Sequence, residues 1–192
     1  QEKRVIYLLD KKEIKILCIL DRDKNYKDLK KITQESLHNI ILVVEKRKGL
    51  IDWKGEYIFI VFSPLITKTY NNEILAVKTG MNILNKLNEH NKKFKSKIEF
   101  NIGVHIGELI ASKIDGKLKY TSIGNTISFS KRISDSDTGK LIISEEIRKK
   151  LLRDLKVSKN KEIGEKQTYN VSEIKDKSGN EARLKDLLKR VK

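Results

Sequence analysis

Residues 101–134, NIGVHIGELIASKIDGKLKYTSIGNTISFSKRIS, decide the fold class of this chain. Apolar and polar residues alternate over 98–112 and 117–122, on either side of an Asp-Gly pair, and this pattern predicts two strands joined by a turn. A short helix over 126–133 follows, opened by Asn125, which is a favourable residue for a helix N-cap. Two strands followed by a helix indicate a layered α+β domain.

The sequence after this stretch predicts further elements of both kinds. Residues 141–144 (LIIS) are apolar throughout and are expected to form a buried strand. A helix is predicted from about 145 to 155, because a serine and two glutamates mark its N-terminus. Residues 167–174 indicate a last strand, and 180–191 a terminal amphipathic helix.

The sequence before it completes the α+β pattern. Residues 14–20 (IKILCIL) form a nearly continuous apolar run and are predicted to be a buried central strand. Apolar residues recur at helical spacing from Leu29 to Val44, which predicts a helix through about residue 46 that Gly49 closes. The remaining elements are the strands 50–53 and 57–63 around a turn at Lys54-Gly55-Glu56, with Pro64 ending the second strand, and a helix over about 73–90.

These elements predict helices that cover a mostly antiparallel sheet. The length of 192 residues suits a single domain. We expect residues 1–12 to be an N-terminal lead-in and residues 13–175 to form the domain. Residues 176–192 are then a C-terminal helix that packs on the same domain.

The charge of the chain bears on its partners. Lys and Arg number 42 against 26 Asp and Glu, so the formal net charge is +16, which first suggests a polyanion partner. The lysines are spread along the chain, however, and aromatic residues that could stack on bases make up only 6%. A solvated, compositionally biased surface is therefore the favoured interpretation, and no specific nucleic acid is expected to bind.

Cysteine content and hydropathy favour an intracellular compartment. The single cysteine, Cys18, excludes an internal disulfide and a multi-cysteine zinc site. No signal peptide is present, and no run of about 18 apolar residues could span a bilayer. We expect a cytoplasmic domain. Because the chain begins with Gln1 and not with Met, it can be the soluble part of a larger or membrane-tethered protein. Membrane contact is expected only through a part absent from this chain.

Three motifs resemble the catalytic domain of class III nucleotidyl cyclases, the adenylate and guanylate cyclases. The corresponding family patterns are I-G-x-H-x-G-E, Y-T-x-I-G-D-x-V-N-x-x-x-R and G-x-I-x-I-S-E. The matching residues are Gly103, His105, Gly107 and Glu108 for the first, Tyr120, Thr121, Ile123, Gly124 and Arg132 for the second, and Gly139, Ile143, Ser144 and Glu145 for the third. The resemblance is strong over 98–155 and moderate over 13–63. It implies the ferredoxin-like βαβ core of that family.

The resemblance also implies a reaction. In the family, the 3′ oxygen of ATP or GTP attacks the α-phosphorus and expels pyrophosphate. Two Mg²⁺ or Mn²⁺ ions, bridged by two carboxylates on adjacent strands, activate the attacking oxygen and hold the triphosphate. An Asn and an Arg of the other subunit hold the ribose and the developing charge, so the sites lie across a two-fold dimer interface.

Each family position can be assigned in this sequence, with several departures. The first metal carboxylate is expected at Asp21, with Asp23 as an alternative, and the second at Glu56. Lys54 is expected to read the base, since its neighbours Asp52 and Trp53 lack the chemistry of the family lysine. The other predicted positions are Asn125 for the base-reading Asp, Ser128 for the ribose-orienting Asn, and Arg132, which keeps its family identity. His105 is expected to be a packing residue.

The departures lead to three hypotheses about function. No glycine follows Asp21 to let the backbone approach a phosphate, and Glu56 and Ser128 place their polar atoms differently from the family residues. The leading hypothesis is a degenerate cyclase domain, a pseudoenzyme, that acts as a dimerisation, scaffold or nucleotide-sensing module without a metal cofactor. The alternative is a divergent active adenylate cyclase that makes cyclic AMP with Mg²⁺ or Mn²⁺. A basic nucleic-acid-binding module is the third. Expected partners are a second copy or another protein, and ATP or GTP.

Overall fold

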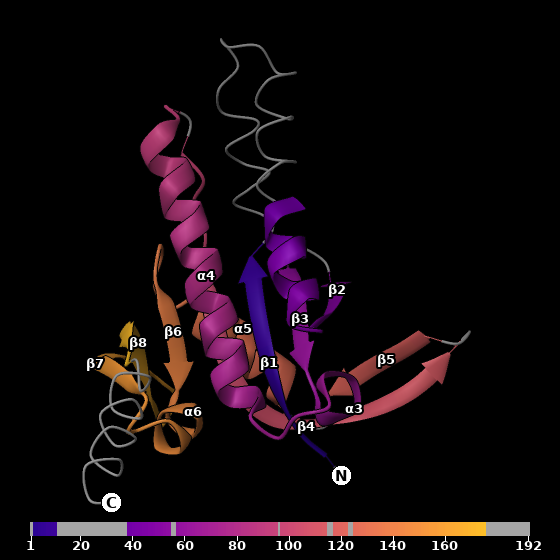
Figure 1. Cartoon of the computed structure of the whole chain (residues 1–192). Coiled ribbons are helices and arrows are strands. Elements are labelled where there is room, and N and C mark those ends of the chain that lie inside the picture. Colours follow the sequence, from indigo (N-terminus) through magenta and orange to yellow (C-terminus); the bar gives the residue numbers. More distant parts are fainter. Residues whose placement is uncertain are drawn as a thin grey trace, which may run out of the picture.

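The described residues fold around one mixed eight-stranded sheet, with helices on both faces (Figure 1). This computed structural model describes residues 2–10, 38–54, 57–95, 97–114, 117–122 and 125–175. The strands are β1 (Glu2–Asp10), β2 (Leu50–Lys54), β3 (Tyr57–Phe62), β4 (Ile102–Ile114), β5 (Lys117–Ser122), β6 (Leu141–Ser144), β7 (Leu155–Ile163) and β8 (Lys166–Ile174). The helices are α3 (Pro64–Thr67), α4 (Asn72–Lys93), α5 (Thr126–Ser134), α6 (Glu145–Lys150) and a helix over residues 38–46.

The strand order is β2-β3-β1-β4-β6-β8-β7, and β5 pairs with β4 beside this path. Every pairing between the described strands is antiparallel except that of β4 with β6. The predicted α+β class with a mostly antiparallel sheet is therefore confirmed.

The sheet divides the core into two layers, because successive side chains of a strand point to opposite faces. Ile58, Ile60 and Phe62 of β3 pack in the large cluster that includes residues of the 38–46 helix and of α4. On the other face, Phe129 and Ile133 of α5 pack with side chains from β6 and β7. Figure 1 shows this arrangement, with α4 in front of the sheet and α5 behind it.

A central strand lies in a segment that the sequence analysis expected to be a lead-in. Residues 2–10, expected as a lead-in, form β1, which pairs with β3 along 5–10 and with β4 along 2–9. The predicted strand at 14–20 lies outside the described residues. Residues 2–10 form a central strand because pairing on both sides satisfies their backbone hydrogen bonds.

The closure of the 38–46 helix differs in detail from the prediction, whose first part, 29–37, lies outside the described residues. The left-handed residue is Lys48, with φ of 57°, and the amide of Gly49 donates to the carbonyl of Val44. Gly49 is needed for space instead. A Cβ there would lie 2.6 Å from Cγ1 of Val44, so only glycine lets the chain turn tightly into β2.

The elements between β2 and β6 follow the prediction, and those after β6 follow it in part. The predicted hairpin strands, the long helix, the β4–β5 pair, the short helix and the strands at 141–144 and 167–174 are all present. The helix predicted over 145–155 ends at Lys150, because Leu151 and Leu155 turn into the core and the chain continues as β7. The amphipathic helix at 180–191 lies outside the described residues. No described helix is both long and apolar enough to cross a membrane.

Candidate functional site

Helix α5 carries three of the predicted site residues on its exposed surface. Asn125 precedes the helix, Ser128 lies in its first turn and Arg132 lies one turn further on. A spacing of three and then four residues places them along one face of a helix. All three are exposed, whereas Phe129 between them is buried against the sheet. The buried side of α5 thus determines where the polar face points.

The polar groups at the start of α5 bond within the helix. Asn125 takes the predicted N-cap position, but its side chain makes no capping hydrogen bond. Its backbone carbonyl accepts from the Phe129 amide at 2.7 Å and from the Ser128 hydroxyl at 3.1 Å. The Ser128 hydroxyl is therefore turned back onto its own helix, while the Asn125 side chain stays at the surface.

Arg132 lines an open cavity of about 380 Å³ between the end of α5 and the β7–β8 turn. The opposite wall includes Lys161 and Glu162 of β7, and Asp135 lies beside Arg132. A guanidinium and an ammonium group thus face one space, although they are far apart in the sequence. A second cation at this place was not predicted, because the sequence analysis did not find β7.

The ends of three adjacent strands meet at the start of β3. Tyr57 pairs with Asp10, the last residue of β1, and with Lys54, the last residue of β2. Glu56 immediately precedes Tyr57 in the sequence and lies outside the described residues. Asp10 and Lys54 therefore lie at the same edge of the sheet, beside Tyr57, the residue that follows Glu56 in the sequence.

A polar contact connects this sheet edge to α5. The Tyr57 hydroxyl donates to Oδ2 of Asp135 at 2.8 Å, and the Lys131 ammonium lies 4.9 Å from the centre of the Tyr57 ring. Both partners belong to the C-terminal end of α5, so Arg132 and the strand ends occupy neighbouring parts of the surface.

Comparison with known proteins assigns the family. Residues 50–179, more than half of the chain, match the family model of the adenylate and guanylate cyclase catalytic domain. The chain belongs to this family. The match includes β2 to β8 and the α5 site residues of the cyclase domain. No curated protein matches the chain.

Solved cyclase structures share the fold of this cyclase domain. The dimeric guanylyl cyclase domain of the RhoGC fusion protein from Blastocladiella emersonii has a TM-score of 0.72 and 17% identity, covering 91% of this chain and 98% of its own. The adenylyl cyclase CyaB from P. aeruginosa has a TM-score of 0.72 and 16% identity, covering 91% and 95%. The guanylate cyclase domain of RhGC from Catenaria anguillulae, in complex with GTP, has a TM-score of 0.70 and 16% identity, covering 91% of this chain and 98% of its own. At these identities the likeness establishes the fold.

The structure of the cyclase domain describes four of the predicted site residues. It places Asn125, Ser128 and Arg132 on α5 and Lys54 at the end of β2, where their roles stay predictions. Asp21, Asp23 and Glu56 lie outside the described residues. Asp10 was missed, although an apolar run ending in an acidic residue, VIYLLD over 5–10, is a visible signal. Among the residues that are described, no three His, Cys, Asp or Glu side chains are grouped to hold a metal ion.

Among the described titratable groups of the sheet, His105 has the pKa that departs most from its ordinary value. It is 5% exposed on β4, and burial lowers its pKa to about 4. Glu146 opposes this shift and Lys166 adds to it. The imidazole is therefore neutral at pH 7, and its burial agrees with the expected packing role.

Proposed function

We propose that this cyclase domain is a nucleotide-sensing and dimerisation module that cyclises ATP or GTP slowly or not at all. The observation that carries the proposal is the orientation of Ser128, whose hydroxyl donates to the Asn125 carbonyl of its own helix. The family pattern has an asparagine here to orient the ribose. Serine is shorter and is already bonded, and the loss of one such donor costs about 10²–10³-fold in rate.

The altered base position supports the same proposal. Asn125 replaces an aspartate, and an amide both donates and accepts hydrogen bonds, unlike an ionised carboxylate. It can still pair with a purine edge, but with a changed preference between bases. Binding of a nucleotide is thus easier to keep than fast cyclisation.

Two cations that line one cavity support nucleotide binding. Arg132 and Lys161 line the same cavity, and a guanidinium with an ammonium group suits a triphosphate. In the family, the Asn and Arg that correspond to Ser128 and Arg132 of α5 complete the site of the other subunit. We therefore propose a homodimer, in which this cavity faces the triphosphate held by the second copy.

Active adenylate cyclase is the second candidate, and the strand ends favour it. Asp10, the last residue of β1, pairs with Tyr57, the first residue of the adjacent strand β3, and Glu56 directly precedes Tyr57 in the sequence. A two-metal site requires two carboxylates on adjacent strands. Carboxylate oxygens are the ligands that Mg²⁺ and Mn²⁺ prefer. Asp10 and Glu56 would then hold the ions, with Asp10 in the role predicted for Asp21. The ions would activate the attacking oxygen and neutralise the triphosphate.

The experiment that tests the proposal measures binding and turnover on the whole chain. A non-cyclisable ATP analogue is titrated by calorimetry, and cyclic nucleotide is assayed with ATP or GTP and Mn²⁺. We expect saturable binding that Arg132→Ala weakens by about tenfold, a loss of one charge-assisted contact of about 1.4 kcal/mol. The matched control is Arg153→Ala, an exposed arginine outside the site, which leaves binding unchanged.

The turnover assay separates the two candidates. We expect little or no cyclic nucleotide from the native chain, and a measurable gain from Ser128→Asn. Cyclic product from the native chain that disappears in Asp10→Asn and Glu56→Gln, while Asp21→Asn keeps it, would establish the active enzyme. Absence of analogue binding would overturn both candidates and leave a scaffold.

A further inference from the structure

The face of β4 under α5 carries an alternating set of residues, Gly103, His105 and Gly107, which we call the α5 seat. A Cβ on Gly107 would lie 2.3 Å from Cγ2 of Thr126, the first residue of α5. A Cβ on Gly103 would lie 2.6 Å from the amide nitrogen of Ser134, the last residue of α5. Both ends of the helix thus rest on strand backbone, and a larger residue at either glycine would lift it.

His105 fills the middle of the seat. Its ring meets that of Phe129 edge-on, with the centres 4.9 Å apart and the planes at 73°. Phe129 lies between Ser128 and Arg132 in the sequence and is buried. The two glycines therefore set the height of α5, and the contact of His105 with Phe129 sets its rotation.

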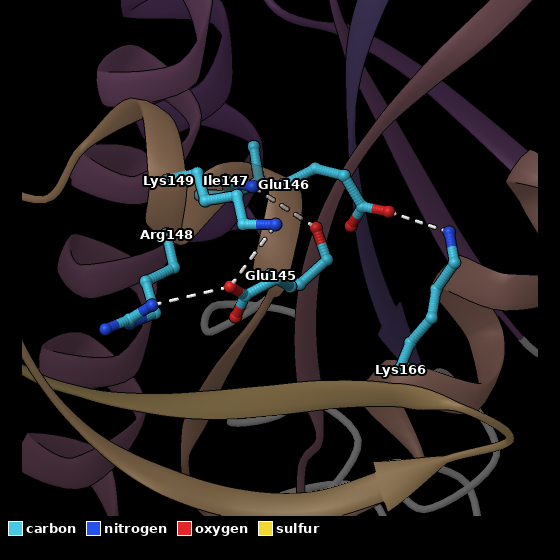
Figure 2. A network of polar contacts seen from close by, with 7 residues as sticks. Glu145, Glu146, Ile147, Arg148, Lys149 and Lys166 are labelled. Carbon is cyan, nitrogen blue, oxygen red and sulfur yellow. Dashed lines mark hydrogen bonds and ion pairs between the residues drawn. The ribbon is translucent and has the colours of Figure 1, made fainter.

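Two charged side chains join His105 and Phe129 to other elements. Nδ1 of His105 lies 3.8 Å from Oε2 of Glu146 on α6. Oε1 of Glu146 accepts from Lys166 of β8 at 2.7 Å, and the Lys166 ammonium lies 5.0 Å from the centre of the Phe129 ring. Figure 2 shows Lys166 reaching Glu146, while the neighbouring Glu145 turns away toward Arg148 and Lys149. Four side chains from four elements therefore form a closed ring of contacts.

The imidazole is an unusual choice for this place. Within the described part of the chain, Nδ1 of His105 and Oε2 of Glu146 are buried and make no hydrogen bond. A buried polar atom without a hydrogen bond destabilises the fold, whereas phenylalanine or leucine would pack on Phe129 without that penalty. The ring of contacts thus contains a feature that packing alone does not require.

We infer that His105 is a positioning residue, which with the two glycines orients α5 on the sheet and ties it through Glu146 and Lys166 to α6 and β8. The inference rests on the proposed function, because α5 carries the residues proposed to meet the nucleotide. It gives the glycine-histidine-glycine motif of β4 a physical role.

The packing of α5 on the sheet should depend on pH through His105. Glu146 of α6 and Lys166 of β8 are the charged groups that face His105, α5 contributes Phe129, and β1 places Ile6 opposite in register. The pKa of His105 is about 4 under α5 and returns toward its ordinary value of about 6.5 when α5 lifts away. When α5 lifts away, His105 binds more protons than it does under α5. The packing of α5 on the sheet is therefore most stable at pH values above the ordinary pKa, and it weakens as the pH falls toward 4. Burial acts to raise the pKa of Glu146, but the hydrogen bond from Lys166 helps to hold it below its ordinary value.

Amide hydrogen exchange on the whole chain tests the inference at about pH 7 and about pH 5, after correction for intrinsic exchange rates. We expect the opening of α5 to become about 20-fold more frequent at the lower pH, as linkage gives for these two pKa values. The exchange of α4 should change much less. His105→Phe keeps a ring against Phe129 and should abolish the pH response of α5.

Two further variants complete the design. His38→Gln, which removes an exposed imidazole from the 38–46 helix, should leave the response unchanged. Lys166→Met removes a cation that disfavours the protonated imidazole and should shrink the response. If His105→Phe does not fold, Lys166→Met alone tests the inference. An α5 response that is absent from the native chain, or that persists in His105→Phe and Lys166→Met, would overturn the inference.

Analogue binding distinguishes this inference from the proposed function. We expect His105→Phe to weaken binding of the non-cyclisable ATP analogue by about threefold to tenfold, as a displaced helix would. If the native chain binds no analogue, the proposed function fails, and the exchange response still decides the role of His105. If the analogue binds and the exchange response is absent, only the inference fails.

Discussion

At the scale of the residue, Gly107 shows how the absence of a side chain can determine the position of a helix. Its backbone faces Thr126, which is buried and β-branched and therefore has little rotamer freedom to move aside. The family motif around His105 thus has a steric reason that lies in this contact. The glycine of the motif therefore sets how closely β4 and α5 can approach each other.

Gly107→Ala should therefore destabilise the fold. The new methyl group would lie 2.3 Å from Cγ2 and 2.5 Å from Oγ1 of Thr126, so α5 must shift. Overpacking of this kind costs about 1–3 kcal/mol, which lowers Tm by about 2–4 °C for each kcal/mol in a domain of this size. Urea unfolding monitored by circular dichroism measures the change. Ser158→Ala, at an exposed position of β7, is the control, and an equal effect of both variants would contradict the steric explanation.

At the scale of the element, β7 shows why a strand can escape detection in sequence. Its residues, LKVSKNKEI, are mostly polar, and only Leu155 and Ile163 at its ends are buried. β7 is the last strand of the described sheet order and pairs only with β8, so its solvent side needs no apolar residues. The helix predicted through 155 ends at Lys150 instead, because Leu151 and Leu155 turn into the core.

The exposed lysines of β7 should keep this edge from pairing with other molecules. Lys156 and Lys159 are exposed on it, and lysine on an edge strand opposes the addition of another strand. We expect the double variant Lys156→Val, Lys159→Val to self-associate at concentrations where the native chain does not, as measured by light scattering. Lys149→Val, Arg153→Val removes the same charge from exposed positions outside the sheet and serves as the control. Association of both double variants would mean that charge, and not the strand edge, is responsible.

At the scale of the whole molecule, the net charge of +16 acts on stability more than on recognition. Most ion pairs of the described residues have at least one exposed partner, as for Lys156 with Glu173 and Lys140 with Asp137, and such pairs contribute little. Repulsion among the excess cations is not compensated by them. The surface charge therefore destabilises the compact state.

Salt should stabilise the chain by screening this repulsion. Raising NaCl from about 20 mM to about 0.5 M shortens the Debye length from roughly 20 Å to roughly 4 Å. We expect Tm to rise by a few degrees in differential scanning calorimetry, and the rise should be similar in sodium chloride and potassium chloride. A Tm that falls with salt would show that attractive surface pairs outweigh the repulsion.

The sequence by itself determined the class of the fold, most of its elements and the family. Hydrophobic period is a local property, so α4, the β2–β3 hairpin and α5 could be predicted from neighbouring residues alone. The motifs around His105, Arg132 and Ser144 are also local, and they identified the cyclase family before any contact was known.

Only the tertiary structure decided that residues 2–10 form a central strand and that Arg132 and Lys161 line one cavity. Residues 2–10 hold that place because β3 and β4 pair with them on both sides, and this long-range pairing sets Asp10 opposite Tyr57. Lys161 lines the same cavity as Arg132 because the β7–β8 turn lies beside α5. Such contacts depend on the free energy of the whole sheet, which no window of sequence contains.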